Sequence, residues 1–161
     1  MRSAIFAGSF DPFHNGHLSV AKKASELFDD VYITIAHNPN KKNRVFSAEE
    51  MKAAIQETLH QNGLTNCFVL IEDGLIAELA QKKGVKYLVR GIRNNLDYNY
   101  EENMAQGNKK VYNDIETIYM RADESALSSS FIRELAYYGT DVSEYVPCAI
   151  NKLIKAKNEK K

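Results

Sequence analysis

Apolar and polar residues follow two alternating patterns along the chain. Short runs that are apolar almost throughout occur at residues 3–8, 31–36, 67–71, 87–91 and 116–120. Between them, apolar residues recur every three or four positions at residues 17–28, 48–61, 75–82 and 130–138, with a more polar run of the same kind at 97–107. Recurrence every three or four positions is typical of helices with one buried face. Apolar strands that alternate with such helices predict the α/β fold class, with a doubly wound parallel sheet covered on both faces.

The segments between these runs indicate how the chain is divided. Ser47 and Glu50 have the spacing of a capping box at the start of the second helix. No repeat, low-complexity tract or linker is visible, so residues 1–161 are predicted to form a single domain. The lysine-rich end, about residues 155–161, is expected to be a frayed and solvated helix end. A phosphate-binding arm is the alternative for this tail.

Net charge and cysteine content limit the kinds of partner. The chain carries 21 Lys and Arg against 21 Asp and Glu, so its surface offers no field to attract nucleic acid or an anionic membrane. The apolar run at the start is too short for a signal peptide, and nowhere do about 18 apolar residues follow one another. We therefore expect a cytoplasmic protein. Cys67 and Cys148 lie in apolar stretches without metal-binding spacing, which predicts two buried free thiols.

The stretch "AGSFDPFHNGH", residues 7–17, lies between the first predicted strand and the first predicted helix. Ligands of doubly wound sheets bind beyond the carboxyl ends of the strands, which is where this stretch falls. Gly8 and Gly16 are expected to let a ligand approach the backbone, and Asp11 before Pro12 indicates a turn. The following helix N-terminus favours phosphate. The spacing matches neither a P-loop nor a dinucleotide-binding fingerprint.

Two histidines, His14 and His17, fall on one face of the first helical turn. Together with Asp11 they could in principle ligate a metal, but no further ligand of the required kind follows, so no metal site is predicted. Beside a glycine-rich turn at a helix N-terminus, at least one of them is predicted to face phosphate. An imidazole N–H can donate to the charge that develops on a transferring phosphoryl group.

Further groups suited to phosphate are expected at the same edge of the sheet. Arg90 and Arg93 flank the end of the fourth strand, and a guanidinium group matches phosphate oxygens with two hydrogen bonds. Lys41 and Lys42 follow the second strand, and at least one of them is expected to meet phosphate. Residues 128–130 are three consecutive serines before the last predicted helix. They can cap that helix or offer hydroxyl and N–H groups to phosphate.

Several motifs resemble those of one enzyme family. The stretch "GSFDPFHNGH" resembles the G-[ST]-F-D-P-x-x-x-G-H signature of the nucleotidyltransferase superfamily. A histidine at position 14 is usual in nicotinate mononucleotide adenylyltransferases, whereas phosphopantetheine adenylyltransferases commonly have threonine there. Three later segments, "RGIRNNLDYNYE", "ALSSSFIREL" and "NPNKKNRVFSAEEM", resemble elements of the phosphopantetheine adenylyltransferases. The first of these is absent from the nicotinate enzymes, and the resemblance extends over residues 4–153.

The resemblance implies a Rossmann-like nucleotidyltransferase fold and a set of site residues. Contacts with ATP are implied for Ser9, Phe10, His17, Gly91, Ile92, Arg93, Glu101, Glu124, Ser125, Ala126, Leu127, Ser128, Ser129 and Ser130. Contacts with 4′-phosphopantetheine are implied for Ser9, Lys41, Ile76 and Arg90. Of these, His17, Lys41 and Arg90 are implied to be catalytic, with His17 stabilising the transition state.

Three positions depart from the family pattern, and one segment is a residue longer than in the family. Ser9 and His14 each replace the commoner threonine, and Glu124 stands where an aromatic residue is frequent. Three residues separate Lys42 from Phe46, where the family element has two. Lys41 is therefore preferred over Lys42 as the substrate lysine, without being decided. The role of His14 stays open.

The implied reaction is adenylyl transfer from ATP to 4′-phosphopantetheine, which yields dephospho-CoA and pyrophosphate in coenzyme A biosynthesis. The phosphate of the acceptor attacks directly, so no covalent enzyme intermediate is expected, and Mg²⁺ is expected to accompany ATP. The family further implies a homohexamer. The alternatives are adenylyl transfer to nicotinate or nicotinamide mononucleotide, and a noncatalytic nucleotide-binding regulator. A nucleic-acid-binding module conflicts with the balanced charge.

Overall fold

Parallel strands form the centre of the protein. The computed structural model describes residues 1–38, 43–123 and 128–160. Within these ranges it contains five strands, namely β1 (Ser3–Gly8), β2 (Asp30–Ala36), β3 (Cys67–Glu72), β4 (Tyr87–Ile92) and β5 (Glu116–Arg121). They pair in parallel in the order β3-β2-β1-β4-β5. The predicted strands and their parallel arrangement are confirmed.

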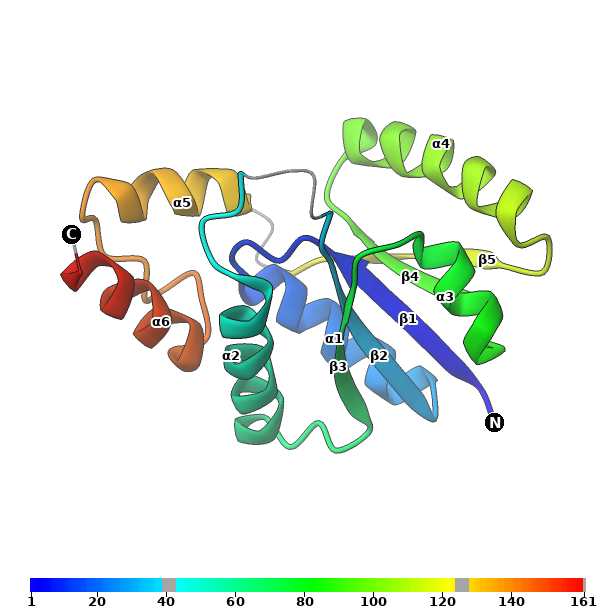
Figure 1. Cartoon of the computed structure of the whole chain (residues 1–161), viewed down its shortest axis with the longest axis horizontal. Coiled ribbons are helices and arrows are strands. Elements are labelled where there is room, and N and C mark those ends of the chain that lie inside the picture. The colour runs from blue at the N-terminus through cyan, green and yellow to red at the C-terminus, as the bar shows by residue number, and fades with distance from the viewer. Residues whose placement is uncertain (39–42, 124–127, 161) are drawn as a thin grey trace.

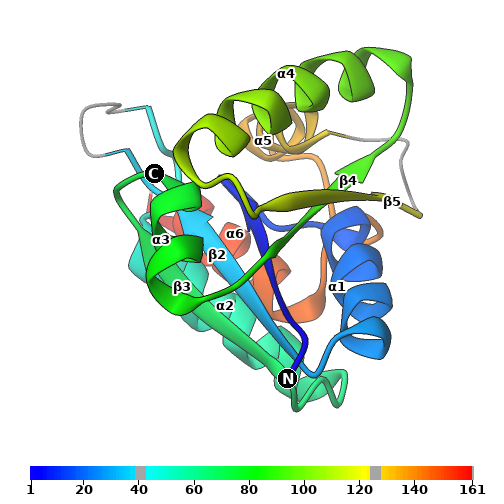
Figure 2. The same cartoon turned by 90° about the vertical axis from the view of Figure 1, so that its right-hand side faces the viewer.

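Helices cover both faces of this sheet (Figures 1 and 2). In the described ranges they are α1 (Asn15–Leu27), α2 (Ala48–Gln61), α3 (Ile76–Lys83), α4 (Asn95–Val111), α5 (Ser129–Tyr137) and α6 (Cys148–Glu159). Figure 2 shows α3 and α4 on one side of the sheet and α2 and α6 on the other. The doubly wound α/β architecture predicted from the apolar pattern is confirmed.

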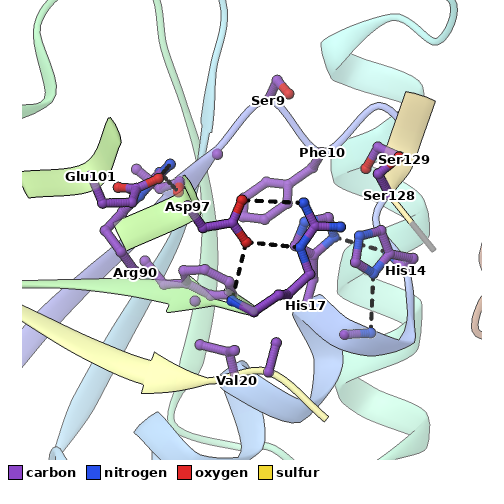
Figure 3. Close-up of a pocket in the computed structure, with 17 residues that line it drawn as sticks. Ser9, Phe10, His14, His17, Val20, Arg90, Asp97, Glu101, Ser128 and Ser129 are labelled. Carbon is purple, nitrogen blue, oxygen red and sulfur yellow. Dashed lines mark hydrogen bonds and ion pairs between the residues drawn. The ribbon is translucent and has the colours of Figure 1, made fainter. Parts of the chain in front are cut away.

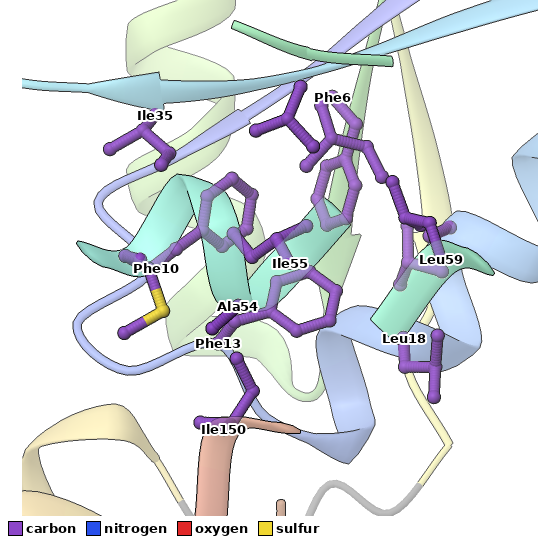
Figure 4. Close-up of a cluster of buried hydrophobic side chains, with 14 of the residues drawn as sticks. Phe6, Phe10, Phe13, Leu18, Ile35, Ala54, Ile55, Leu59 and Ile150 are labelled. Carbon is purple, nitrogen blue, oxygen red and sulfur yellow. The ribbon is translucent and has the colours of Figure 1, made fainter. Parts of the chain in front are cut away.

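The alternation of side chains along β1 divides the interior into two cores. Ala4 and Phe6 belong to the larger core, which α1, α2, α5 and α6 complete and which Figure 4 shows in part. Ile5 and Ala7 point to the opposite face and belong to a much smaller core beneath α3 and α4. Successive residues of a strand face opposite sides of its sheet, so this division follows from the strand geometry.

The predicted helices are confirmed, although several boundaries differ by one or two residues and α4 ends four residues later than predicted. The capping box at the start of α2 is present, with the Ser47 hydroxyl accepting from the N–H of Glu50 and the Glu50 carboxylate accepting from the N–H of Ser47. Among the helices described, none is long and apolar enough to cross a lipid bilayer.

Two expectations near the C-terminus were incomplete or wrong. Only the lysine-rich end was expected to be helical, whereas α6 begins at Cys148 and packs along α2. Its buried residues form a stripe of Ala149, Ile150 and Ile154, and the two isoleucines belong to the larger core together with residues of α2. Cys148 lies off this stripe and is exposed, so its predicted burial is wrong, while the burial of Cys67 is confirmed.

Candidate active site

A cavity lies at the carboxyl edge of the sheet, where the strand order reverses between β1 and β4 (Figure 3). Such a reversal is where doubly wound sheets bind their ligands. The cavity has a volume of about 230 Å³. It is lined by residues of the β1–α1 turn, the end of β4, the start of α4 and the N-terminus of α5. Its polar and charged lining residues are Ser9, His14, His17, Arg90, Arg93, Asp97, Glu101, Ser128 and Ser129.

His14, whose role the sequence left open, caps helix α1. Its Nδ1 atom accepts a hydrogen bond from the N–H of Gly16 (3.0 Å), and its own N–H donates to Nδ1 of His17 (3.0 Å). This reciprocal pair satisfies two backbone donors that a helix N-terminus otherwise leaves without a partner. A Cβ atom on Gly16 would lie 2.8 Å from the His14 ring. The capping ring therefore requires glycine at position 16. This reason is separate from the expected approach of a ligand to the backbone.

The two imidazole rings stack, with their centroids 3.7 Å apart. Burial, followed by the charge of Arg93, lowers the pKa of His14 from 6.5 to about 4. Burial is also the main cause that holds the pKa of His17 well below its ordinary value, with further contributions from His14, Arg90 and Arg93. Both rings are thus neutral at neutral pH. Since Nδ1 of each ring accepts a hydrogen bond, each ring carries its proton on Nε2 and can act as a neutral N–H donor.

Aromatic side chains hold the His17 ring in place. Phe10 meets it edge to face at 4.9 Å between centroids, and Phe13 lies at 5.4 Å on another side. Phe10 has a φ of 47° and is 1% exposed, so its ring is buried beneath the turn. A Cβ atom on Gly8 would lie only 3.0 Å from the Phe10 ring. The side chain of Phe10 therefore acts as a support for His17.

Arg90 is joined to Glu101 by two hydrogen bonds, from Nε to Oε2 and from Nη2 to Oε1, each 2.7 Å long. Its Nη1 atom donates to the carbonyl of Ala7. Glu101 is 7% exposed, and this pairing supplies the compensation that a buried carboxylate requires. Of the five N–H groups of Arg90, two have no partner among the residues described. Helix α4 thus delivers a carboxylate that orients Arg90 at the edge of the cavity.

Arg93 is oriented in a similar way by Asp97. Both its backbone N–H (3.1 Å) and its Nε atom (3.0 Å) donate to Oδ2 of Asp97. The N–H of Asp97 in turn donates to the side chain of Asn94, which caps α4. Asp97 therefore orders the segment between β4 and α4. Tyr98, the next residue, packs edge to face on Tyr119.

The serine run contributes in two ways. The Ser128 hydroxyl caps α5 by accepting from the N–H of Phe131 (3.2 Å), and the Ser129 hydroxyl donates to the carbonyl of Pro12 (2.9 Å). Both residues line the cavity, whereas Ser130 is exposed and is not among the lining residues. Capping is therefore present, and the structure also brings the N-terminus of α5 to the cavity. A role of these serines in binding phosphate stays a prediction.

A second cavity of about 190 Å³ adjoins the first. The two share Ala7, Arg90 and Glu101 in their linings. The second cavity is mainly apolar and lies between the start of α3 and the inner side of α4. Its remaining lining residues are Gly74, Leu75, Ile76, Leu88, Val89, Met104, Ala105, Asn108 and Thr117. Ile76, which the resemblance implies as a contact of 4′-phosphopantetheine, thus lies in the apolar wall of this cavity.

Several site residues predicted from the sequence either lie outside the described residues or do not line the first cavity. Lys41, its alternative Lys42, Glu124, Ser125, Ala126 and Leu127 lie outside the described residues. Ile92 closes β4 but does not line the cavity, unlike its neighbours Gly91 and Arg93. The roles of all these residues stay predictions.

Sequence reasoning missed the residues that hold the turn from outside. Arg44 and Arg133 both donate to carbonyl groups of residues 9–11, and the Asp11 carboxylate accepts two backbone N–H groups from residues 45 and 46. All three are charged residues with little or partial exposure. Nothing in their local sequence indicates a partner more than thirty positions away.

In the part of the chain that is described, no three His, Cys, Asp or Glu side chains are grouped to hold a metal ion. The two carboxylates that line the first cavity, Asp97 and Glu101, are each paired with an arginine.

The fold and the phosphate-suited cavity at its switch point define a class of protein. Residues 5–135 match the model of the cytidylyltransferase-like family. The structure is similar to that of a protein from Vibrio parahaemolyticus described as a nicotinate-nucleotide adenylyltransferase, with a TM-score of 0.68 over 96% of this chain and 99% of the other. The two sequences are 18% identical, so this likeness concerns the fold. The chain is a nucleotidyltransferase-type α/β protein.

Similar sequences narrow this class to one family. A phosphopantetheine adenylyltransferase from Streptococcus agalactiae is 41% identical over 98% of both chains. Phosphopantetheine adenylyltransferases from Lacticaseibacillus casei (41%, covering 96% of this chain and 92% of the relative) and Thermodesulfovibrio yellowstonii (35%, covering 99% of both chains) are similar over comparable lengths. The chain belongs to the phosphopantetheine adenylyltransferase family.

Proposed function

We propose that this protein transfers the adenylyl group of ATP to 4′-phosphopantetheine, giving dephospho-CoA and pyrophosphate in coenzyme A biosynthesis. The observation that carries the proposal is that two cavities of different chemistry meet at the Arg90–Glu101 pair. The first cavity presents N–H donors and helix N-termini, which suit phosphates. The second is apolar and suits the pantetheine arm, so the acceptor phosphate would lie at the junction.

The residues divide between the two substrates accordingly. We propose that ATP contacts Ser9, Phe10, His17, Gly91, Ile92, Arg93, Glu101 and residues 124–130. Ile76 would contact the pantetheine arm, while Arg90, Ser9 and Lys41 would hold its phosphate. Support comes from the two N–H groups of Arg90 that remain for a ligand and from the place of Ile76 in the second cavity.

The chemical step is a single displacement at phosphorus. An oxygen of the acceptor phosphate forms a bond to the α-phosphorus of ATP, the bond to the oxygen bridging the α- and β-phosphorus breaks, and its electron pair leaves with pyrophosphate. The attacking oxygen already carries negative charge, so no side chain has to remove a proton. The protein contributes by aligning both substrates and stabilising the charge that develops.

His17 would donate its Nε2–H to a phosphate oxygen of ATP as charge accumulates in the transition state. A neutral donor suits this task because burial keeps the pKa of His17 low and the ring does not change its charge near neutral pH. Its orientation is set in advance by the His14 N–H and the Phe10 ring, so little reorganisation is needed during the reaction.

Mg²⁺ would enter together with ATP, coordinated by phosphate oxygens and water. The arginine-paired carboxylates of the cavity fit this arrangement, since neither Asp97 nor Glu101 is free to bind a cation. When bound, the ion would neutralise part of the charge on the leaving pyrophosphate.

We further propose that the chain acts in the cytoplasm, where ATP is available, and as a homohexamer. Helix α4 supports assembly, because Tyr100 and Val111 on it are exposed although they are large and hydrophobic. Contacts between copies would cover such side chains. The number of subunits is implied by the resemblance and is measurable by light scattering coupled to size-exclusion chromatography.

The second candidate is adenylyl transfer to nicotinate or nicotinamide mononucleotide. It is favoured by His14, which lines the first cavity and is the usual residue at this position in that family. The Arg90–Glu101 pair and the apolar cavity beside it favour phosphopantetheine instead.

The test compares acceptors in one assay. The protein is incubated with ATP and Mg²⁺ plus either 4′-phosphopantetheine, nicotinate mononucleotide or nicotinamide mononucleotide, and pyrophosphate and the nucleotide product are quantified. We expect pyrophosphate and dephospho-CoA with phosphopantetheine only. Release with a mononucleotide alone supports the second candidate, and no release with any acceptor supports a nucleotide-binding regulator.

The direct displacement is tested separately by stereochemistry. ATP that carries sulfur at the α-phosphorus in one known configuration is used as the substrate, and the product configuration is determined. A single displacement is expected to invert the configuration. Retention would indicate two displacements and hence a covalent enzyme intermediate, contrary to the proposed mechanism.

A further inference from the structure

Side chains from distant segments hold the backbone of the active-site turn. Four consecutive carbonyl groups, those of residues 9–12, each accept a hydrogen bond. Arg44 donates from Nη1 to Ser9 (2.6 Å) and from Nη2 to Phe10 (3.4 Å). Arg133 donates to Asp11 (2.6 Å), and Ser129 donates to Pro12 (2.9 Å). The turn therefore lies in a fixed frame provided by the β2–α2 connection and by α5.

The attachment to the β2–α2 connection is reciprocal. The Asp11 carboxylate accepts from the N–H of Val45 (3.0 Å) and from the N–H of Phe46 (2.9 Å). Arg44 also donates from Nε to the carbonyl of Phe46 (2.7 Å). Asp11 is only 5% exposed, so these bonds are shielded from water. Arg44 links the two segments, because it donates both to the turn and to a carbonyl of its own segment.

The frame matters because of what the turn carries. Phe10 occupies a left-handed backbone conformation, with a φ of 47°, which a bulky side chain rarely adopts. In this conformation its ring lies edge to face against His17. The carbonyls on either side of the Phe10 side chain, those of Ser9 and Phe10, are the two that Arg44 binds. Arg44 thus stabilises the conformation that supports His17.

Arg44 lies in the segment where this chain departs from the family pattern. The three residues between Lys42 and Phe46 are Asn43, Arg44 and Val45, one more than the family element has. The middle one of these three residues, Arg44, is the one whose guanidinium group reaches the turn. Arg44 lines neither cavity, so it reaches no substrate in either of them directly.

We propose that Arg44 is a positioning residue for adenylyl transfer, which acts through the carbonyls of Ser9 and Phe10 on the placement of Ser9 and His17. The inference rests on the proposed function. A residue in this role lowers turnover when it is removed, because a displacement of about 1 Å at the reacting groups costs roughly a hundredfold in rate. Binding of substrates is expected to depend less on it, since Arg44 lines neither cavity.

The experiment compares three variants of the full chain with the unaltered protein. Arg44→Met removes the guanidinium and keeps most of the side-chain length, and Arg44→Lys keeps the charge but loses the fork that binds two carbonyls. Arg2→Met is the matched control, because Arg2 is exposed and lies at the amino end of β1, remote from the cavity. For each protein we would measure kcat with 4′-phosphopantetheine, the Kd of ATP by calorimetry, and the Tm.

We expect kcat to fall by about 10- to 100-fold in Arg44→Met while the Kd of ATP changes by less than about threefold. Arg44→Lys is expected to lose at least about fivefold in kcat, since a single ammonium cannot replace the fork. Arg2→Met should match the unaltered protein. If Arg44→Met fails to fold, Arg44→Lys alone decides the matter.

Normal kcat in a folded Arg44 variant, with only a lower Tm, would overturn the inference and leave Arg44 a purely structural residue. A loss that appears entirely in the Kd of ATP would also overturn it, because it would indicate a direct contact with the nucleotide. Failure of the proposed function is distinguishable, since the unaltered protein itself would then release no pyrophosphate with phosphopantetheine.

Discussion

The two halves of the candidate site rest on the two faces of the sheet and are held by different means. The turn before α1 is anchored in the larger core by Phe10 and Phe13, which are fully buried, and by hydrogen bonds to its carbonyls. The half that contains Arg90 rests on the smaller core and on α4. Among the described side chains of α4, Glu101 alone is buried. The first half is held by packing and hydrogen bonds, and the second mainly by an ion pair.

This difference matches the demands of the two substrates. The turn presents N–H donors that must be aligned before the reaction, and rigid packing provides such alignment. In the proposed function the Arg90 side admits a long acceptor between α3 and α4, and an element with few buried contacts suits this task. Elements of this kind open more easily than core helices do. The following predictions test this contrast, beginning with the largest expected effect.

Removing the His17 ring tests the packed half. His17→Ala deletes the Nε2–H donor, and loss of one such donor typically lowers turnover by about 10²- to 10³-fold. The cap on the His14 N–H is also lost, which should lower the free energy of unfolding by about 1 kcal/mol. His60→Ala, at an exposed position of α2, is the control. Turnover is measured by pyrophosphate release. If it is unchanged in His17→Ala, His17 has no part in the mechanism.

Breaking the Arg90–Glu101 pair tests the other half. Glu101→Gln keeps the shape of the side chain but leaves a partly buried guanidinium without its counterion. We expect the free energy of unfolding to fall by about 2 kcal/mol, less than for a fully buried pair because the Arg90 side chain is 27% exposed. The KM for 4′-phosphopantetheine should rise by roughly tenfold, because Arg90 is no longer oriented. Urea denaturation and steady-state kinetics measure both effects, and an unchanged KM would contradict the assignment of Arg90.

Acid stability tests the buried imidazoles of the packed half. The pKa of His14 is about 4 in the folded protein against 6.5 ordinarily, so between these values the unfolded chain binds the extra proton. The free energy of unfolding should therefore fall as the pH decreases through this window, by about 1 kcal/mol per pH unit for this residue. His14→Asn retains a capping side chain and lacks the imidazole, so its stability should depend less on pH. The free energy of unfolding is measured by denaturation at neutral pH and at about pH 5 for both proteins. An equal decrease in the two proteins would contradict the role of His14 in acid stability.

The smallest effect is expected at an ion pair that neither core shields. Lys109 and Glu116 lie 2.6 Å apart, but their side chains are 46% and 60% exposed. Glu116→Gln should change the free energy of unfolding by less than about 0.5 kcal/mol, and added salt should reduce even this. The variant is a chemical match for Glu101→Gln. A similar loss in both would mean that burial does not distinguish the two pairs.

Much of the fold was predictable because its signal is local. The apolar strands and the Ser47 capping box were recognised from spacing alone, and parallel strands bring their carboxyl ends to one edge. This is why His17, Arg90 and Arg93 could be assigned to a common site. The first part of helix α6 was not predicted, because its apolar stripe follows a proline and merges into a lysine-rich end. The exposure of Cys148 depends on which face of α6 meets α2, which the neighbouring residues alone do not indicate.

The sequence by itself determined the fold class, the phosphate-suited turn and the family, because each depends on residue types at short, fixed spacings. Only the tertiary structure decided how the site residues are held. It paired Arg90 with Glu101, made His14 the cap of α1 and placed Arg44 beneath the turn. Folding brings together groups from distant parts of the chain, and these groups decide whether a charged side chain faces a substrate, a carboxylate or a carbonyl. Arg44 is an example, because it binds the carbonyl of Ser9 at a sequence separation of 35.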